Sequence, residues 1–481
     1  MLIIKYSDII NNNFSLSPNN YNKVPIETTN VVPLSLLVEK IIKGEEIGSR
    51  NYTQESVYKF IRTSGIVNDK YLLDENENSI LNINPNSFVS KNLSQGDILI
   101  CKDSNVGDVA MLRKDYDTYM FSSGINKLIL KRHKNYVFSV MKHKNFKKQL
   151  ITLISKGSTL KHAKNTYLKC LIPFPNDDKV IEYVSNLTLS IVNKEKIILE
   201  KFNEINKFIE NTIDSNQKAN IFVFKFPRLS QILGRSRLDT GIYNEEYKKI
   251  EHKILNFSNG YYYISKNKIH GGNTPKQRII GGNKEYDFYW ITPTSINDFG
   301  IFNLGDSIYC KKQNINKNCM LIINRTSKGG KGEYVGIAHY YDYRHFGLAQ
   351  HNQGIYRIDG YPDEELIFMT CLLNSKYYRK LCANLSMGSK MKEIKLNNIL
   401  EIPFPNFSKN NRKTICQNYY NKETKLNDIS PTQFLSIDNE WNKKAGIINI
   451  YESLHETKKI LNKVIDDIYN NVPINITYKI F

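Results

Sequence analysis

The chain has 481 residues and a mass of 55.9 kDa, which is too much for one ordinary hydrophobic core and suggests about two or three domains. With 67 Lys and Arg against 47 Asp and Glu, the net charge of +20 is typical of a polyanion binder. The seven cysteines include no C-x-x-C pair, and no stretch is apolar enough to span a membrane. These features argue against a zinc site, a disulfide framework and export, and they predict a cytoplasmic location.

The first half begins with segments that have the pattern of β-strands joined by polar loops. FIRTSGIVND starts at Phe60, and GDILICKDSNVGDVAML occupies 96–112. A basic run follows within 127–148 and is the best candidate in this half for contact with phosphates, although a solvated helix surface would look the same. The half closes on Ile172-Pro173-Phe174-Pro175, whose prolines prevent a strand from continuing.

A long helix is predicted over 179–213, which contains neither Pro nor Gly. Its apolar residues recur every seven positions, and a companion seam runs beside them. The predicted seam residues are Val184, Leu187, Ile191, Ile198, Ile205 and Phe208. Such a pattern fits either a helix that pairs with another long helix or an ordinary core helix of one domain.

The second half repeats the first. WITPTSIND starts at Trp290 and matches the segment from Phe60 at an offset of 230 (290 − 60), and the second Ile-Pro-Phe-Pro begins at Ile402, at the same offset from the first (402 − 172). Gly157 aligns with Gly388 at an offset of 231, and Leu99 aligns with Leu321 at an offset of 222. Two anchors at one offset, with small insertions between them, indicate an internal duplication. The period is too long for a solenoid, whose repeats span about 20 to 50 residues.

A second long helix is predicted near the C-terminus, so that the chain reads globule, helix, globule, helix. Its seam residues are Ile447, Ile450, Leu454, Leu461, Val464 and Ile468. Pro431 and the polar residues around it predict that this helical region is interrupted. Two such helices entering from opposite globules are expected to pair antiparallel.

Sequence motifs for catalysis and metal binding are absent. KGGKGE at 328–333 lacks the spacing of a phosphate-binding P-loop, and no H-E-x-x-H or G-x-S-x-G motif occurs, nor the Asn/Asp-Pro-Pro-aromatic motif of enzymes that methylate amino groups. The acidic residues of GYPDEEL at 360–366 fit the start of a helix better than a nuclease metal site. We therefore expect no enzyme activity, no metal and no cofactor in this chain.

The doubled pattern resembles the specificity subunit of Type I restriction-modification systems. In the second half, YISKNKIHGGNTPKQRIIGG followed by FYWITPTSIND resembles the entry motif of that family, and RSRLDTGIYNEEYKKIE, 235–251, resembles the segment that opens a recognition domain. In the first half, YKFIRTSGI matches well, whereas EIGSRNYT stands where the Gly-Gly-x-Thr-Pro turn would be.

The resemblance implies an α+β fold: two β-rich target-recognition domains joined by long antiparallel coiled-coil spacer helices, as a pseudo-twofold repeat. The domains would be 1–176, the spacer helix 177–218, the second domain 219–408 and the helical region 409–481. Each domain would read one half of a bipartite double-stranded DNA target. The partners would be two adenine methyltransferase subunits, which hold S-adenosylmethionine, and a restriction and motor subunit, which holds ATP, in a system for defence against foreign DNA.

Loop residues with fork-shaped, amide, hydroxyl or charged side chains are the candidates for DNA contact, because polar groups on loops can read base edges while cations anchor phosphates. In the first half they are Arg62, Thr63, Ser64, Lys102, Asp103, Asn105, Lys131, Arg132 and Lys144; in the second half they are Lys276, Gln277, Arg278, Thr292, Thr294, Arg325, Thr326 and Lys328.

Two other interpretations remain open. A non-catalytic protein-interaction scaffold of two duplicated β-rich modules would share the same pattern but would lack a salt-dependent affinity for duplex DNA. A self-contained restriction and methylation enzyme would bind S-adenosylmethionine by itself, and the missing methyltransferase motifs argue against it.

Overall fold

The computed structural model describes residues 24–154, 163–235, 237–238, 240–276, 279–280, 288–297, 299–302, 308–328 and 332–481. These residues form two compact units, each assembled from separated stretches of the chain. Unit 1 lies within Met1–Ile197, Thr424–Lys443 and Glu452–Phe481, and unit 2 lies within Ile198–Glu423 and Lys444–Tyr451. The units therefore do not coincide with continuous segments, and the boundaries 1–176, 177–218, 219–408 and 409–481 stay a prediction.

Unit 1 contains two small sheets, a short strand pair and two helices that follow the last sheet strand. Its elements in chain order are β1 (Val31–Pro33), α2 (Leu34–Leu37), β2 (Val38–Lys43), β3 (Lys59–Ile61), η3 (Thr63–Gly65), β4 (Ile80–Asn82), β5 (Ile98–Cys101), β6 (Val109–Met111), β7 (Tyr119–Phe121), β8 (Ile125–Leu130), α3 (Lys134–Lys142), α4 (Lys144–Leu153) and β9 (Leu171–Pro173). The core of this unit includes Ile61, Leu99 and Phe121.

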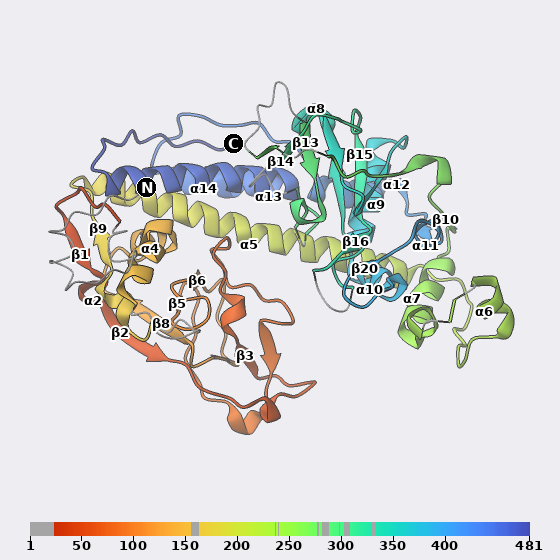
Figure 1. Ribbon diagram of the computed structural model, residues 1–481, viewed down its shortest axis with the longest axis horizontal. Helices are drawn as coiled ribbons and strands as arrows, with labels where there is room; N and C mark the ends of the chain where they lie inside the picture. Colours follow the sequence, from red (N-terminus) through yellow and green to blue (C-terminus); the bar gives the residue numbers. More distant parts are fainter. Residues whose placement is uncertain are drawn as a thin grey trace. The chain divides into compact units, whose positions relative to one another are not determined.

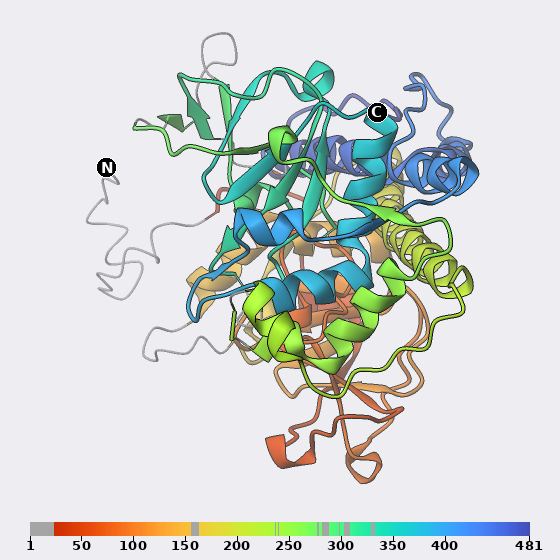
Figure 2. The same ribbon diagram turned by 90° about the vertical axis from the view of Figure 1, so that its right-hand side faces the viewer.

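Unit 2 repeats this order with additional elements. They are α6 (Leu229–Arg235), η6 (Thr240–Tyr243), α7 (Glu245–Leu255), β10 (Tyr261–Tyr262), β11 (Ile269–Gly271), β12 (Ile279–Ile280), β13 (Phe288–Ile291), η8 (Pro293–Ser295), β14 (Ile308–Cys310), β15 (Cys319–Ile323), β16 (Arg325–Thr326), β17 (Ala338–Tyr341), α8 (Tyr343–Phe346), β18 (Ala349–His351), β19 (Ile355–Ile358), α9 (Asp363–Asn374), α10 (Lys376–Leu385), β20 (Lys392–Glu393), α11 (Leu396–Leu400), β21 (Phe404–Pro405) and α12 (Lys409–Tyr419). Helix α9 packs on β15 and β17, and α12 packs on α9 (Figures 1 and 2).

The sheets of the two units share a common topology, to which unit 2 adds β12 at the edge of one sheet and the separate strand pair β16–β20. One sheet is ordered β2-β8-β5-β6 in unit 1 and β11-β19-β15-β17 in unit 2, with antiparallel neighbours throughout. In the other sheet, β3 pairs antiparallel with β4 and parallel with β7, as β13 does with β14 and β18. The register repeats too: Lys59 faces Tyr119, and Tyr289 faces Ala349, which is the same shift on both strands (289 − 59 = 349 − 119). The internal duplication is thus a duplication of the fold.

The two Ile-Pro-Phe-Pro motifs are fixed in the same way. In unit 1 the buried Tyr136 hydroxyl donates to the Pro173 carbonyl at 2.5 Å, and its ring packs against Phe174. In unit 2 the buried Tyr378 hydroxyl donates to the Pro403 carbonyl at 2.6 Å, and its ring packs against Phe404. Because each tyrosine lies on a helix of its own unit, the motif joins the last strand to the helical layer.

Three further α-helices are α5 (Asp178–Ser215), α13 (Phe434–Lys444) and α14 (Ile447–Tyr469). Short 3-10 helices also occur at η2 (Ser49–Asn51), η4 (Pro85–Ser87), η5 (Thr166–Lys169) and η7 (Lys266–Lys268). The predicted interruption is present, since residues 420–433 between α12 and α13 are not helical. All predicted seam residues are buried except Phe208, which is half-buried, and the adjacent Ile209 is buried instead. A straight helix has about 3.6 residues per turn, so a strict seven-residue pattern drifts from the buried face over several turns.

Within unit 1, α5 and α14 run antiparallel. The Gln149 amide donates both to the Leu171 carbonyl just before α5, at 3.0 Å, and to the Tyr469 hydroxyl at the end of α14, at 3.1 Å. Glu195, further along α5, pairs with Lys458, which is earlier in α14, at 2.7 Å. Residue numbers that increase along α5 therefore pair with residue numbers that decrease along α14, which is an antiparallel arrangement. Lys194 interrupts the apolar face of α5 and forms a buried ion pair with Asp438 of α13.

The molecule is mixed α and β, with small open sheets rather than closed barrels and with long helices, as the α+β prediction with an internal repeat requires. Within the described residues, none of the helices combines the length and the apolar character needed to cross a membrane.

Candidate nucleic-acid interface

Four loops of unit 1 gather at the ends of its strands and form what we name the first loop cluster: 44–45, 62–65, 102–105 and 122–124. Lys102 N donates to the Gly124 carbonyl at 2.9 Å, and Ser122 N donates to the Ile61 carbonyl at 2.9 Å. The side-chain amide of Asn105 donates to the Thr63 carbonyl at 3.3 Å. The cluster therefore contains the six candidates at 62–64 and 102–105, which are far apart in sequence.

Unit 2 has the same arrangement, the second loop cluster: 272–273, 292–295, 324–328 and 352–354. Asn324 N donates to the Gly354 carbonyl at 3.0 Å, and Asn352 N donates to the Ile291 carbonyl at 2.8 Å. These two bonds repeat the two in unit 1 at the offsets of the sequence duplication. The candidates Thr292, Thr294, Arg325, Thr326 and Lys328 all belong to this cluster.

Glycines at equivalent positions allow the loops to approach closely. A Cβ on Gly44 would lie 2.0 Å from the Ser122 carbonyl oxygen, and a Cβ on Gly272 would lie 2.0 Å from that of Asn352. Gly44 is thus the structural counterpart of the Gly-Gly-x-Thr-Pro turn and lies just before EIGSRNYT, where the sequence pattern locates that turn. The backbone contacts identify this glycine as equivalent to Gly272. The sequence does not, because Glu-Glu-Ile follows Gly44 whereas Asn-Thr-Pro follows Gly272.

The side chains on this common scaffold differ between the clusters. Asp103 of the first cluster corresponds to Arg325 of the second, and Thr63 corresponds to Pro293. Arg62 and Ser64 of the first cluster are exposed and contact the Asn78 carbonyl at 3.3 Å. Thr292 of the second cluster caps η8, with its hydroxyl 2.8 Å from that of Thr294. Two similar scaffolds therefore present different donors and acceptors.

The basic run of unit 1 is not a continuous phosphate-facing surface. Lys127 is buried and pairs with Asp97 at 2.6 Å, and Lys147 pairs with Asp108 at 2.6 Å. Lys142 donates to three carbonyls, and burial lowers its pKa to about 8. Lys144 pairs with Asp466 of α14 at 2.7 Å. These lysines hold elements of unit 1 together. The number of basic residues in a sequence does not distinguish lysines in this structural role from lysines that contact DNA.

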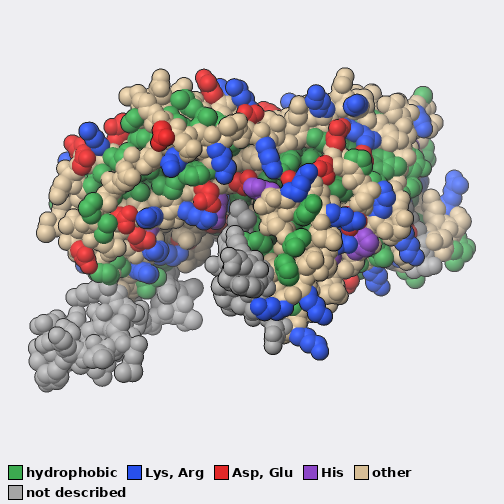
Figure 3. All heavy atoms as spheres, turned by 90° about the horizontal axis from the view of Figure 1, so that it is seen from above, with side chains coloured by type: hydrophobic (Ala, Val, Ile, Leu, Met, Phe, Trp, Pro, Cys, Tyr) green, Lys and Arg blue, Asp and Glu red, His purple; other side chains and the backbone are tan. Residues whose placement is uncertain are grey.

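Other predicted contact residues lie outside the clusters. Lys131 and Arg132 are exposed between β8 and α3, and Lys276 is exposed in the loop after β11. Gln277 and Arg278 lie outside the described residues. On the face drawn in Figure 3, basic and acidic side chains are interspersed.

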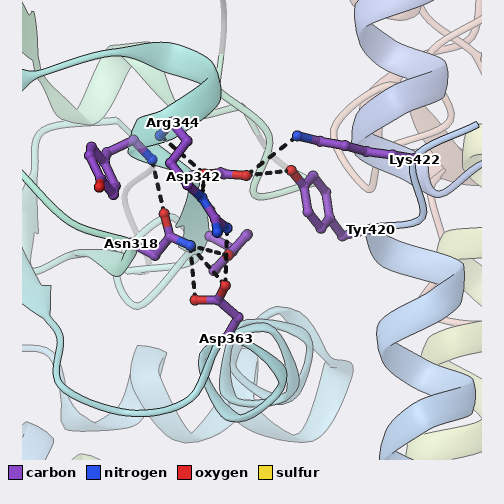
Figure 4. A network of polar contacts seen from close by, with 8 residues as sticks. Asn318, Asp342, Arg344, Asp363, Tyr420 and Lys422 are labelled. Carbon is purple, nitrogen blue, oxygen red and sulfur yellow. Dashed lines mark hydrogen bonds and ion pairs between the residues drawn. The ribbon is translucent and has the colours of Figure 1, made fainter. Parts of the chain in front are cut away.

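The carboxylates of Asp342 and Asp363 accept hydrogen bonds within a polar network of unit 2 (Figure 4). Asp363, at the start of α9, accepts from the Asn318 amide at 2.8 Å and from Arg344 at 3.2 Å. Buried Asp342 accepts from Arg344 Nε at 3.0 Å and from the Tyr420 hydroxyl at 2.8 Å. Burial alone would raise the pKa of Asp342, but these donors and Lys422 lower it. The network ties the segment after α12 to the sheet of unit 2.

No group of His, Cys, Asp and Glu side chains that could hold a metal ion is found among the described residues. The carboxylates of the network are instead occupied by Arg344, Asn318 and Tyr420.

Comparison with known proteins gives matches among solved structures alone. No family model matches the chain, and no curated protein matches it. The chain is similar to the S subunit of a Type I restriction-modification system from M. genitalium, with 14% identity and a TM-score of 0.42, covering 94% of this chain and 100% of that one. It is also similar to the HsdS subunit from Thermoanaerobacter tengcongensis, with 11% identity and a TM-score of 0.28, covering 92% and 96%.

A third match is a chain from a structure described as the structural basis of complex assembly and conformational transition of the type I R-M system. Its identity is 13% and its TM-score 0.29, and the match covers 92% of this chain and 97% of that one.

Proposed function

We propose that this chain is the sequence-specific DNA recognition subunit of a Type I restriction-modification complex. The first loop cluster would read one half of a bipartite duplex target, and the second loop cluster would read the other half. The observation that carries the proposal is the pair of loop clusters with one backbone scaffold and different side chains, Asp103 against Arg325 and Thr63 against Pro293.

That combination suits an asymmetric target. A repeated scaffold offers each half-site the same approach to the groove, while the side chains set the bases that are read. Arg325 carries the fork that pairs with O6 and N7 of guanine, whereas Asp103 can accept only from an amino group such as N4 of cytosine. The two clusters would therefore prefer different bases on equivalent scaffolds.

The finer parts of the proposal follow from the sequence resemblance. The long helices would set the spacing of the half-sites and dock two methyltransferase subunits. The chain itself would carry no catalytic site; S-adenosylmethionine would be held by the methyltransferase subunits and ATP by the restriction and motor subunit. The duplicated motifs and the motif order support this division.

A test is to express the chain with its genomic neighbours and to map modified adenines in the host DNA by single-molecule sequencing. We expect a bipartite motif with a fixed gap that disappears on deletion of this chain and changes in one half when residues 1–170 are exchanged for those of a diverged homologue. The proposal fails if every methylated motif survives the deletion while the methyltransferase partner remains active.

A second candidate, the protein-interaction scaffold, is favoured by one surface feature of unit 2. Residues 221–238 carry Ile221, Val223, Phe226, Leu229, Leu233 and Leu238, each between 67% and 88% exposed. Exposed apolar groups in such number are typical of an interaction surface. The same deletion experiment separates the candidates, because a scaffold without DNA specificity leaves the methylated motifs unchanged.

A further inference from the structure

Two glycine-containing segments from distant parts of unit 2 line one pocket, and a third glycine packs against one of them. The lining segments are 240–241, at the start of η6, and 386–388 of the loop before β20, and Gly332 lies next to Ser386. The pocket has a volume of about 330 Å³ and is lined by Thr240, Gly241, Ala383, Asn384, Ser386, Met387, Gly388 and Lys392. None of these turns belongs to the second loop cluster.

Close approach requires glycine at each turn. A Cβ on Gly241 would lie 2.5 Å from the Asn384 carbonyl oxygen, and a Cβ on Gly332, whose φ is +82°, would lie 2.3 Å from Ser386 Oγ. Gly388 has φ +100°, and its Cβ would meet the Met391 carbonyl oxygen at 2.2 Å. In the turn 386–388, the N–H groups of Ser386 and Met387 already donate to the Cys382 and Glu393 carbonyls, so side chains have to supply most of the attraction for an anion.

The side chains around the pocket have the matching charge. Lys392 is half-buried and forms no ion pair with a described carboxylate, and Arg237 reaches the Leu385 carbonyl at 3.3 Å. The Thr240 hydroxyl adds a group that can donate, whereas the Ser386 hydroxyl donates to the Ala383 carbonyl at 2.6 Å. No carboxylate is among the residues that line the pocket.

The pocket adjoins the second loop cluster through a strand pair. In β20, Lys392 faces Thr326 of β16, and Glu393 faces Arg325. The loop is closed by two bonds between Met387 and Glu393, of 2.8 and 2.9 Å, and Ile394 N donates to the Asn324 carbonyl at 2.8 Å. A ligand in this pocket would therefore lie beside the residues proposed to read bases.

We infer that the pocket formed by Thr240–Gly241 and the loop 386–392 binds a backbone phosphate of the DNA, with Lys392 as its principal cation. This inference rests on the proposed function and adds a contact that is independent of base sequence. The repeat agrees with such a role, because Gly-Ser-x-x-Lys occurs at 157–161 as well as at 388–392, whereas the loop clusters differ. The DNA phosphates are the same at every half-site, so the residues that contact them need not differ between the two units.

The test measures the affinity of the full chain, co-purified with its partner subunits, for a fluorescent 30-base-pair duplex of random sequence over a range of salt concentrations. Lys392→Gln is expected to lower the slope of log affinity against log salt by about 0.9 and to weaken binding by the same factor on every duplex. Lys392→Arg, which keeps the charge, should retain the slope. Lys413→Gln, at an exposed lysine of α12 away from the pocket, is the matched control and should have a smaller effect.

An unchanged slope in Lys392→Gln would overturn the phosphate site, and so would an equal loss in Lys413→Gln. Failure of the proposed function gives a different result: the methylated motif would then be independent of this chain, whatever Lys392→Gln does to the slope. A variant with a lower slope and an unchanged methylated sequence supports both.

Discussion

Lys194 and Asp438 form a buried ion pair within a polar contact between helices α5 and α13. Both side chains are 1% exposed, and Ser190 and Asn442 bond the same carboxylate at 2.9 and 3.1 Å. Removing two charges from water costs about as much as their attraction returns, so such a pair specifies alignment more than it adds stability. One partner without the other leaves an uncompensated buried charge.

Lys194→Met should therefore destabilise unit 1 by about 3–5 kcal/mol, and adding Asp438→Leu should recover most of that loss. The chain has two tryptophans, Trp290 in unit 2 and Trp441 in unit 1, so a Trp290→Phe background lets fluorescence report unit 1 during urea unfolding. Lys459→Met, which breaks a surface pair with Glu456, is the control and should change stability by less than about 1 kcal/mol. A double variant as unstable as the single one would contradict this account.

Buried histidines make unit 2 sensitive to acid. Burial lowers the pKa of His339 to about 4 and that of His351 to about 4, whereas an unfolded histidine titrates near 6.5. The unfolded chain thus binds more protons between these values, so the stabilising contribution is complete above about pH 6.5 and is lost as the pH falls toward 4. The expected slope is about 1.4 kcal/mol per pH unit for each histidine.

His339→Phe isolates one of these contributions, because the new ring can keep the stacking on Phe302. In a Trp441→Phe background, Trp290 fluorescence should show a shallower fall of the urea midpoint between pH 6.5 and 4.5 in this variant than in its parent. The same slope in both would show that His339 is not a source of the acid sensitivity.

At the scale of elements, the Ile-Pro-Phe-Pro strands depend on one tyrosine hydroxyl each. Tyr136→Phe should destabilise unit 1, and Tyr378→Phe should destabilise unit 2, each by about 1–3 kcal/mol, because each leaves a buried proline carbonyl without its donor. Urea unfolding monitored by the tryptophan of each unit measures both. An effect in one unit and none in the other would show that the two motifs are not held alike.

The sequence predicts the elements better than it predicts the contacts of their side chains. The offsets that align Leu99 with Leu321 and Phe60 with Trp290 also align strands that the structure shows to be equivalent, and heptads with no Pro or Gly mark 179–213 inside α5. The internal contacts of Lys127 and Lys142 could not be predicted from the sequence. Asp97, which pairs with Lys127, and the carbonyls that accept hydrogen bonds from Lys142 lie on other strands and loops, distant in sequence. The convergence of turns near Thr240, Gly332 and Gly388 depends on contacts over longer separations still.

Because the two loop clusters have equivalent scaffolds in separate units, we expect each cluster to read its own half of the DNA target independently of the other. Asp103→Ala should change the preferred bases in one half of the methylated motif, and Arg325→Ala should change them in the other, with a loss of about 1–3 kcal/mol of discrimination at the affected position. Methylome sequencing of the two variants checks this. If either substitution altered both halves, the clusters would not be independent readers.

The division of the chain between the units has a consequence for its synthesis. Unit 2 lies within Ile198–Glu423 and Lys444–Tyr451, whereas unit 1 also needs Glu452–Phe481. Translation proceeds from the N-terminus, and domains generally fold in the order in which they emerge. Here the order is reversed: unit 1 is not complete until Glu452–Phe481 has left the ribosome, so a nascent chain arrested after Tyr451 would contain the segments of unit 2 and an unfinished unit 1.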